Sequence, residues 1–419
     1  MGKTMCEKIL SRSLKDNNIK PGDYIWVEPD AVSTSVVGNL LSYFEHYDIK
    51  NLYDPERIYV TEDHCVPAIN LEFANMHRDM RIFVKKYKIR NFFEIGYGVQ
   101  HVIFPMHGLV SPGDLIAGSD SHTISHGAFN AASFSVNEEL AYLMCTGKVW
   151  LKVPESIRIE FDGHLNKQDF CNGKDVVLYL LKYLVSGSVN YNSIEFTGLG
   201  IKSLSILDRI CISNMCSELG AKFAIFPFDE ITSIYLKDKM VRVSKPVKPD
   251  SDACYKFTKK IDLGSIEPYV ACPHRPENAY PVNEIDSQRI RINQAFIGGC
   301  INGMDDFYMA AKILFKRKIN SSVRLIVTPP SQEIWKKCLH DGVWDIFIEA
   351  NAIITNANCG ACSGAHSGVL ADNEVCISSS NRNYQGRMGS SNSSIYLANA
   401  ATVAASAVNG YITDPRYFL

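Results

Sequence analysis

Residues 294–303 read QAFIGGCING, a short apolar run that passes directly into a glycine-rich turn carrying a cysteine. A helical pattern follows over residues 305–315. A buried strand, a tight turn and a helix form the repeating unit of α/β domains with parallel sheets. The stretch therefore predicts an α/β fold and puts Cys300 at the end of a parallel strand.

The same alternation of apolar runs and amphipathic patterns extends outward from this stretch. Further strands are expected at residues 58–60, 92–95, 115–117, 193–197, 323–327, 352–355 and 375–377. Residues 29–38 are expected to form an irregular polar segment, residues 250–261 a connection, and residues 395–408 a single helix. Domain boundaries are expected to give α/β/α domains at residues 1–152, 153–285 and 286–419.

The composition excludes several classes of protein. Of 419 residues, 46% are hydrophobic and 21% charged, and the net charge is −2. Without a basic block or an acidic tail, neither nucleic acid nor a membrane surface is expected as a partner. No apolar run approaches the roughly 18 residues of a membrane span, and no apolar signal segment opens the chain. Thirteen cysteines without a disulfide framework indicate a reducing, cytoplasmic setting.

Three of these cysteines form a candidate metal centre. Residues 359–362 read CGAC, so Cys359 and Cys362 can reach one centre from a single loop, and Cys300 can reach it from another. Three thiolates suit an iron–sulfur cluster or a zinc ion, and a C-x-x-C pair can also be a redox pair. From the residues alone these three alternatives stay open. A four-iron cluster on three cysteines would leave one iron free to act as a Lewis acid.

Glycines flank both cysteine loops. We expect them to let the backbone approach a bulky inorganic group and to aim N–H donors at its sulfurs. They are Gly298, Gly299, Gly360 and Gly364.

Histidines follow three expected strands of the first domain. His64 ends the stretch TEDH at 61–64, His101 ends GYGVQH at 96–101, and His122 lies in GSDSHT at 118–123. Asp63 and Asp120 lie in two of these turns. Ligands gather at the carboxyl ends of parallel strands, and an aspartate beside a histidine raises its basicity. A shared acid–base site is predicted; Asp-His turns with capping roles are the alternative.

Two arginines and one glutamate complete the candidate set. Arg382 and Arg387 lie in NRNYQGR at 381–387, where their guanidinium groups suit the carboxylates of a di- or tricarboxylic acid. Both could instead be solvated. Glu218, beside apolar residues at the end of an expected helix, could have a raised pKa and donate a proton. A surface role for it is the plainer alternative.

These motifs resemble the large subunits of 3-isopropylmalate dehydratase, in the shorter archaeal-type group of the aconitase superfamily. The resemblance runs from MGKT at 1–4 to TDPRY at 413–417, and its most specific parts are DSHT at 120–123, CGAC at 359–362 and NRNYQGR. It implies a three-domain aconitase-like α/β large subunit that lacks the swivelling fourth domain. A separate small subunit would carry that domain with its serine base, and the large subunit would be inactive alone.

The resemblance also implies roles for individual residues. Cys300, Cys359 and Cys362 would hold one [4Fe–4S] cluster per subunit. It also implies two acid–imidazole pairs in the active site, Asp63 with His64 and Asp120 with His101. His122 and Glu218 are the further implied active-site residues. Substrate binding is implied for Ser121, Asn302, Arg382 and Arg387. The implied reaction removes water from, and returns it to, a hydroxy-diacid in leucine biosynthesis.

Three stretches depart from the pattern of that family. Ser33 to Ser35 stand in place of a Thr-x-His-Asp type stretch. Residues 298–304 read GGCINGM in place of Gly-Ser-Cys-Thr-Asn-Gly-Arg. Residues 130–134 read NAASF, in a segment that is usually glycine-rich. Two alternatives therefore accompany the isopropylmalate reading. One is a dehydratase for another substituted malate, such as dimethylmalate, or for homoaconitate. The other is a catalytically silent, cluster-bearing sensor.

Overall fold

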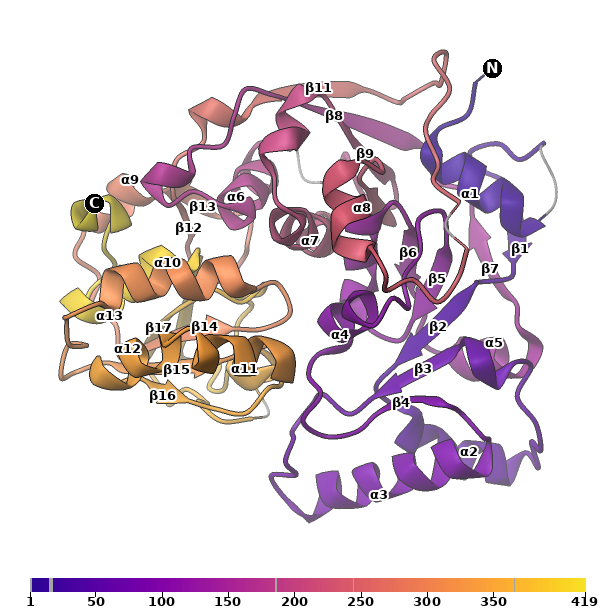
Figure 1. The fold of residues 1–419 in the computed structure, drawn as a ribbon, viewed down its shortest axis with the longest axis horizontal. Helices are drawn as coiled ribbons and strands as arrows, with labels where there is room; N and C mark the ends of the chain where they lie inside the picture. Colours follow the sequence, from indigo (N-terminus) through magenta and orange to yellow (C-terminus); the bar gives the residue numbers. More distant parts are fainter. Residues whose placement is uncertain (1, 15–17, 185–186, 244, 365) are drawn as a thin grey trace.

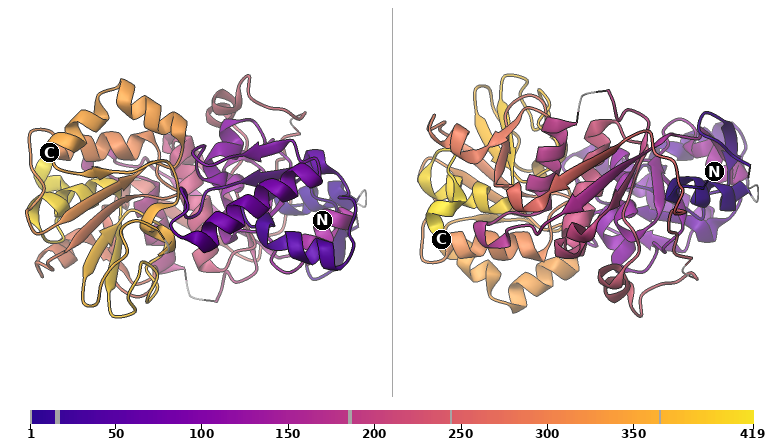
Figure 2. Two further views of the ribbon diagram at one scale, coloured as in Figure 1. Left: turned by 90° about the horizontal axis from the view of Figure 1, so that it is seen from below. Right: turned by 90° about the horizontal axis from the view of Figure 1, so that it is seen from above.

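Three mainly parallel sheets, one from each third of the chain, organise the computed structural model (Figure 1). The structure describes residues 2–14, 18–184, 187–243, 245–364 and 366–419. The first and third units lie side by side, and the middle unit bridges them (Figure 2). No helix in the described part of the chain is long and apolar enough to cross a membrane.

The first sheet is entirely parallel and has the order β4-β3-β2-β5-β6. Its strands are β2 (Ala31–Thr34), β3 (Ile58–Thr61), β4 (Asn91–Phe93), β5 (Leu115–Gly118) and β6 (Ala132–Ser135). The chain builds outward from β2 to one edge and then returns to build from β5 to the other. This reversal opens a crevice at the carboxyl ends of β2 and β5, where ligands bind in sheets of this kind.

Helices cover this sheet, and a short ribbon extends the unit. The helices are α1 (Met5–Leu14), α2 (Leu40–His46), α3 (Leu71–Lys86), α4 (Gln100–Met106) and α5 (Leu140–Thr146). Strands β1 (Tyr24–Val27) and β7 (Val149–Lys152) pair as an antiparallel ribbon. The sequence predicts a helix over residues 1 to about 20, of which residues 1 and 15–17 lie outside the described residues; the observed α1 ends at Leu14.

The expectation of an irregular segment at residues 29–38 is wrong for its first half. Residues 31–34 form β2, the central strand of the sheet, and all four are buried. Ser33 and Thr34 are small and polar, so no apolar run marks the strand. The position requires small side chains, because a Cβ at Gly118 on the neighbouring strand would lie 2.3 Å from the Ser33 hydroxyl.

The middle unit has a four-stranded parallel sheet in the order β10-β9-β8-β11. Its strands are β8 (Ser156–Asp162), β9 (Ser193–Thr197), β10 (Phe223–Ile225) and β11 (Thr258–Asp262). Its helices are α6 (Gly173–Tyr183), α7 (Ile206–Met215) and α8 (Glu230–Leu236). The connection expected over residues 250–261 therefore ends in an edge strand. Because only Ile261 of β11 is buried, the strand shows no apolar pattern.

The third sheet has seven strands in the order β13-β12-β18-β17-β14-β15-β16. They are β12 (Tyr269–Ala271), β13 (Ala279–Pro281), β14 (Gln294–Gly298), β15 (Arg324–Thr328), β16 (Ile353–Ile354), β17 (Val375–Ser378) and β18 (Ser394–Ala398). Strands β12 and β13 come before residue 285, so this sheet includes chain assigned to the second expected domain. The helices are α9 (Val282–Asp286), α10 (Met304–Leu314), α11 (Gln332–His340), α12 (Val343–Glu349) and α13 (Ala400–Asn409).

The single helix expected at residues 395–408 is two elements. Strand β18 occupies its start, and Asn399 caps α13 by accepting a 2.8 Å hydrogen bond from the Thr402 amide. An asparagine at the N-cap separates strand from helix in this way. Ile395 and Leu397 are buried in alternation, as a strand requires.

Candidate active site

The three cysteines reach one region from neighbouring strands of the third sheet. Cys300 follows β14, while Cys359 and Cys362 lie in the turn after β16. Strands β14, β15 and β16 are parallel neighbours, so their carboxyl ends meet at one edge. Cys300 and Cys362 are buried, and Cys359 is partly buried.

Amide side chains hold the two buried thiols. Asn214 Nδ2 donates to Cys300 Sγ at 3.2 Å, and Asn381 Nδ2 donates to the same sulfur at 3.5 Å. The Cys362 thiol donates to Asn381 Oδ1 at 3.2 Å. Asn381 therefore touches both sulfurs. Burial raises the pKa of Cys300, and the charges of Cys359 and Cys362 raise it further.

This donor set fits a soft metal group. N–H donors aimed at sulfur stabilise the thiolate form that binds metal. Among the described residues, two groups bring three possible metal-ligand atoms within 4.8 Å of one another. The three cysteines do not form such a group. Thiolates around a single zinc ion lie about 4 Å apart, given Zn–S bonds of roughly 2.3 Å. At least one pair of the three sulfurs therefore lies more than 4.8 Å apart, which suits a polynuclear cluster better than a single zinc ion.

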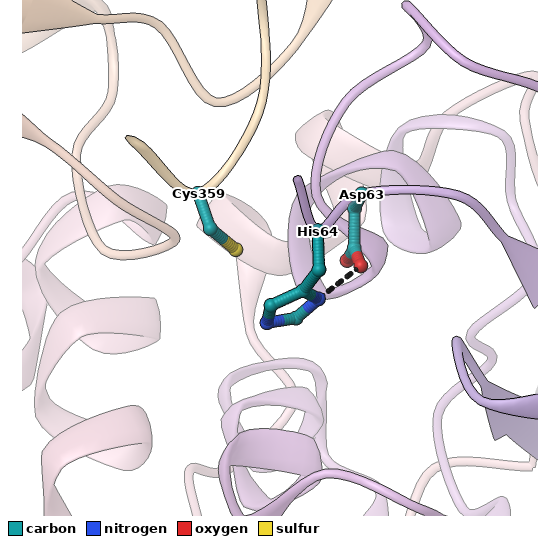
Figure 3. Close-up of side chains that lie close together, drawn as sticks. All are labelled: Asp63, His64 and Cys359. Atoms are coloured by element: carbon teal, nitrogen blue, oxygen red, sulfur yellow. Dashed lines mark hydrogen bonds and ion pairs between the residues drawn. The ribbon is translucent and has the colours of Figure 1, made fainter. Parts of the chain in front are cut away.

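The first acid–imidazole pair lies against the cysteine loop (Figure 3). His64 Nδ1 is 2.6 Å from Asp63 Oδ1, and the backbone N–H of Gln100 donates to Asp63 Oδ2 at 3.0 Å. The Cys359 amide donates to the Asp63 carbonyl at 3.3 Å. The charge of Cys359 raises the pKa of His64 well above its ordinary value, although burial opposes the shift; Asp63 adds to it.

The second acid lies between two histidines. Asp120, just after β5, pairs with His101 Nε2 at 3.0 Å and accepts a 2.7 Å bond from the His122 amide. His122 Nε2 is 3.3 Å from Glu218 Oε1. Burial alone would raise the pKa of Asp120, but the charge and hydrogen bonds of the two histidines hold it well below its usual range. The result is a continuous chain of ionisable groups.

Glu218 differs from its expectation. We expected a raised pKa and a proton donor, yet the pKa of Glu218 is lowered to about 2. Burial would raise it, but His122 and Arg382 stabilise the carboxylate more strongly. Arg382 Nε donates at 2.7 Å and the Tyr384 hydroxyl at 2.6 Å. Glu218 is therefore a carboxylate that orients its neighbours.

The two arginines are not equivalent. Arg382 is committed to Glu218 and to the Ser121 hydroxyl, to which its Nη2 donates at 2.8 Å. Arg387 Nη2 lies 3.9 Å from Cys362 Sγ, and its buried Nε has no hydrogen-bond partner within the described chain. Asn302 Nδ2 donates to the Gly298 carbonyl at 2.7 Å and so braces the turn that carries Cys300. Arg387 alone of these groups keeps an unused donor beside the thiols.

Three of the four glycines are also needed for close packing of the loops. A Cβ at Gly360 would lie 2.7 Å from Phe296, and one at Gly298 would lie 2.6 Å from the Thr328 carbonyl. A Cβ at Gly364 would lie 2.4 Å from the Arg387 carbonyl. These three let the loops pack on the sheet and on each other. Gly299, at φ +96°, supplies a left-handed turn before Cys300.

Several functional contacts were not predicted from sequence. Asn214 and Asn381 hold the thiols, Tyr384 binds Glu218, and the Gln100 amide binds Asp63. Asn381 and Tyr384 lie within the loop singled out for its arginines, and Asn214 lies four residues before Glu218. Attention to every polar residue of those stretches, rather than to the charged ones, would have found them.

Glu62, beside Asp63, provides a pH-dependent prediction. Burial raises the pKa of Glu62 to about 8, and Glu94 adds to the shift. Between the ordinary value of 4.5 and about 8 the unfolded chain binds fewer protons, so this residue lowers stability as pH rises. We expect Glu62→Gln, which still accepts a bond from Arg81, to raise the free energy of unfolding at pH 8 by on the order of 1 kcal/mol.

At pH 4 the same substitution should give no gain, because the carboxyl is then protonated in both states. Thermal melts at the two pH values measure the effect. Glu56→Gln, at a largely exposed site, is the matched control and should change neither melt. An equal shift of Glu62→Gln at both pH values would contradict the prediction.

One family model and several relatives of similar length match this chain. Residues 54–410 match the model of the aconitase family (aconitate hydratase). The chain is similar to "3-isopropylmalate dehydratase large subunit 1" of Methanopyrus kandleri, at 41% identity over 423 residues, covering 100% of both chains. It is 43% identical over 424 residues to the "3-isopropylmalate dehydratase large subunit" of Aquifex aeolicus, covering 99% and 97%.

A relative from Caldicellulosiruptor bescii with the same name is 41% identical over 418 residues, covering 99% of this chain and 97% of the relative. Among solved structures, the holo-form of Thermococcus kodakaraensis aconitase X has a TM-score of 0.46 and 12% identity, covering 99% and 97%. That similarity is too low to bear on the fold.

Proposed function

The chain belongs to the aconitase family of iron–sulfur hydro-lyases, and on that premise we propose that it is the large subunit of a 3-isopropylmalate dehydratase. It would interconvert 2-isopropylmalate and 3-isopropylmalate by dehydration and rehydration, in leucine biosynthesis. A separate small subunit would complete the site, since the curated relatives that match over their whole length are large subunits.

The observation that carries the proposal is the convergence of three elements on one site. Thiols from the third sheet lie against an acid–imidazole pair from the first, and Asn214 of α7 joins them from the middle unit. Cys300, Cys359 and Cys362 would hold a [4Fe–4S] cluster. When bound, the cluster would supply a Lewis-acidic iron that polarises the hydroxyl of the substrate.

The chain's own residues would manage the proton at the departing hydroxyl. Burial lowers the pKa of His122, but hydrogen bonds to Asp120 and Glu218 raise it overall. His122 can therefore hold a proton near the site, with Asp120 compensating the charge. Such positioned acids contribute about 10²–10⁴-fold to a rate. The base that removes the carbon-bound proton would come from the small subunit.

Arg387 would bind a substrate carboxylate. Its Nε is buried without a partner in the described chain and its Nη2 lies 3.9 Å from Cys362 Sγ, so the guanidinium keeps an unused donor and has one edge beside the thiols. We expect Arg387→Lys to raise KM about 10–100-fold, because lysine cannot form two parallel hydrogen bonds to a carboxylate. Steady-state kinetics measure this. Arg416→Lys, at an ion pair with Asp414 outside the site, should leave KM unchanged.

The decisive test is an anaerobic assay of the purified chain with its small subunit on a panel of hydroxy-diacids. Turnover of isopropylmalate only in the mixture supports the proposal. Turnover of dimethylmalate or homoaconitate instead would favour a dehydratase for another acid. A cluster-loaded pair without any turnover would favour the sensor.

A further inference from the structure

The first turn of α6, in the middle unit, is bonded to two segments of the third unit that surround the buried thiols. Its N-cap Asn172 donates through Nδ2 to Asp306 Oδ1 at 2.9 Å, and Asp306 Oδ2 accepts from the Gly303 amide at 2.8 Å. Gly303 ends the turn that follows β14. Lys174, two residues beyond the N-cap, donates from Nζ to the Ser380 carbonyl. One helix end therefore braces both segments.

The bond to the Ser380 carbonyl matters because Asn381 comes next in the chain. The amide of Asn381 lies between two thiols, with Nδ2 3.5 Å from Cys300 Sγ and Oδ1 3.2 Å from Cys362 Sγ. The carbonyl of residue 380 and the backbone N–H of residue 381 share one planar peptide group. Holding that carbonyl therefore fixes the backbone from which the Asn381 amide extends toward both sulfurs.

The charge of Lys174 has no carboxylate partner. Lys174 is 3% exposed, and a buried ammonium is costly unless its charge is compensated. No carboxylate oxygen of the described residues lies within 4.0 Å of its Nζ. Burial lowers the pKa of Lys174 to about 8, and the charges of Cys211 and Cys362 oppose this shift more than the nearby acids do. Burial raises the pKa of the Cys211 thiol, which stays neutral. The compensating charge is therefore that of Cys362.

We propose that Lys174 is a positioning residue of the metal centre. Its ammonium group holds the Ser380 carbonyl so that Asn381 meets both thiols, and its positive charge offsets the negative charge of the metal-bound thiolates. This rests on the three-cysteine ligand set of the proposed function, and on no particular substrate. Removing groups that orient metal ligands from outside the ligand set typically costs 10–100-fold in metal affinity or activity.

A cavity beside Lys174 allows the ammonium group to be replaced from solution. The cavity measures about 220 Å³, lies between α6, α7 and α10, and is lined by Lys174. Cutting the side chain back to alanine removes three carbons and the nitrogen, which are the heavy atoms of propylammonium. n-Propanol has the same shape without the charge. Lys312, an exposed residue of α10, lines the same cavity and provides a control.

Iron loss from the cluster-loaded full chain tests the inference. The anaerobic protein is challenged with an iron chelator, and visible absorbance follows the loss. We expect Lys174→Ala and Lys174→Met to lose iron about 10–100-fold faster than wild type. Propylammonium should bring Lys174→Ala to within about threefold of wild type, and n-propanol should not. Lys312→Ala should lose iron at the wild-type rate.

Two results would overturn the inference. Iron loss from Lys174→Met within threefold of wild type would show that the ammonium group is not needed. Equal rescue of Lys174→Ala by n-propanol and propylammonium would show that the side chain only fills space. Lys174→Met keeps the length of the side chain, so it carries the test if circular dichroism shows that Lys174→Ala is unfolded.

The same measurements separate this inference from the proposed function. A wild-type chain that binds no cluster would remove the ligand set, and the role of Lys174 with it. A stable cluster in a pair that turns over no hydroxy-diacid would overturn the reaction alone, and the rates of iron loss would still decide the role of Lys174. Turnover of isopropylmalate with unchanged iron loss in Lys174→Met would overturn the inference alone.

Discussion

Replacing Cys300 by serine is expected to abolish activity and cluster binding together. The hydroxyl is a poor ligand for iron compared with a thiolate. A polarising iron would contribute several kcal/mol to the transition state, so the loss should be at least about 10³-fold in kcat. Iron and sulfide analysis after anaerobic reconstitution, with visible absorbance, measures the cluster directly.

Two cysteines provide controls for this experiment. Cys216 is buried like Cys300, and Cys254 is exposed. The variants Cys216→Ser and Cys254→Ser should keep the iron and sulfide content of wild type, because neither residue belongs to the triad. Circular dichroism should show that all three variants are folded. Full cluster content in Cys300→Ser would remove Cys300 from the ligand set.

Replacing Asp120 by asparagine is expected to separate catalysis from cluster binding. Asp120 bonds to His101 and His122 but to none of the thiols. Asparagine keeps the shape and loses the negative charge that helps to hold a proton on His122. We expect kcat to fall about 10²–10⁴-fold while iron content stays unchanged.

The same substitution should also shift the pH dependence of kcat in a defined direction. Because hydrogen bonds and charge from Asp120 raise the pKa of His122, its loss lowers that pKa. The alkaline limb of the kcat profile should therefore move to lower pH in Asp120→Asn. The matched control, Asp229→Asn, weakens an ion pair with the buried Arg209 outside the site and should leave the profile in place. A kcat within threefold of wild type would exclude an acid–base role for Asp120.

Local patterns in the sequence predicted the parts of the fold that depend on neighbouring residues. The turn after β14 was predictable because an apolar run meets glycines there. The contact of Asp63 with His64 joins adjacent residues. Strand β2 was not predicted, since its small polar residues match a buried site that exists only when β3 and β5 flank them.

Contacts between segments that lie far apart in the chain could be identified only from the structure. The pairing of Asp120 with His101 was expected only from resemblance to a family, because strand order decides which turns meet. The lowered pKa of Glu218 depends on Arg382, which lies 164 residues away in the chain. Asn214 and Asn381 carry no charge, so the search for charged residues in those stretches passed over them as partners of the thiols. The domain limits remain predictions. Strands β12 and β13, which come before residue 285, belong to the third sheet.

The backbone bond from the Cys359 amide to the Asp63 carbonyl has a consequence for biogenesis. The first half of the site leaves the ribosome early in synthesis, and the cysteine turns leave it only near the end. The turn with Cys300 follows β14, which pairs with β17, so the sheet beneath this turn is complete only after β17 has been translated. We therefore expect iron and sulfide to be delivered to an almost finished polypeptide. Nascent chains halted before residue 362 should carry none.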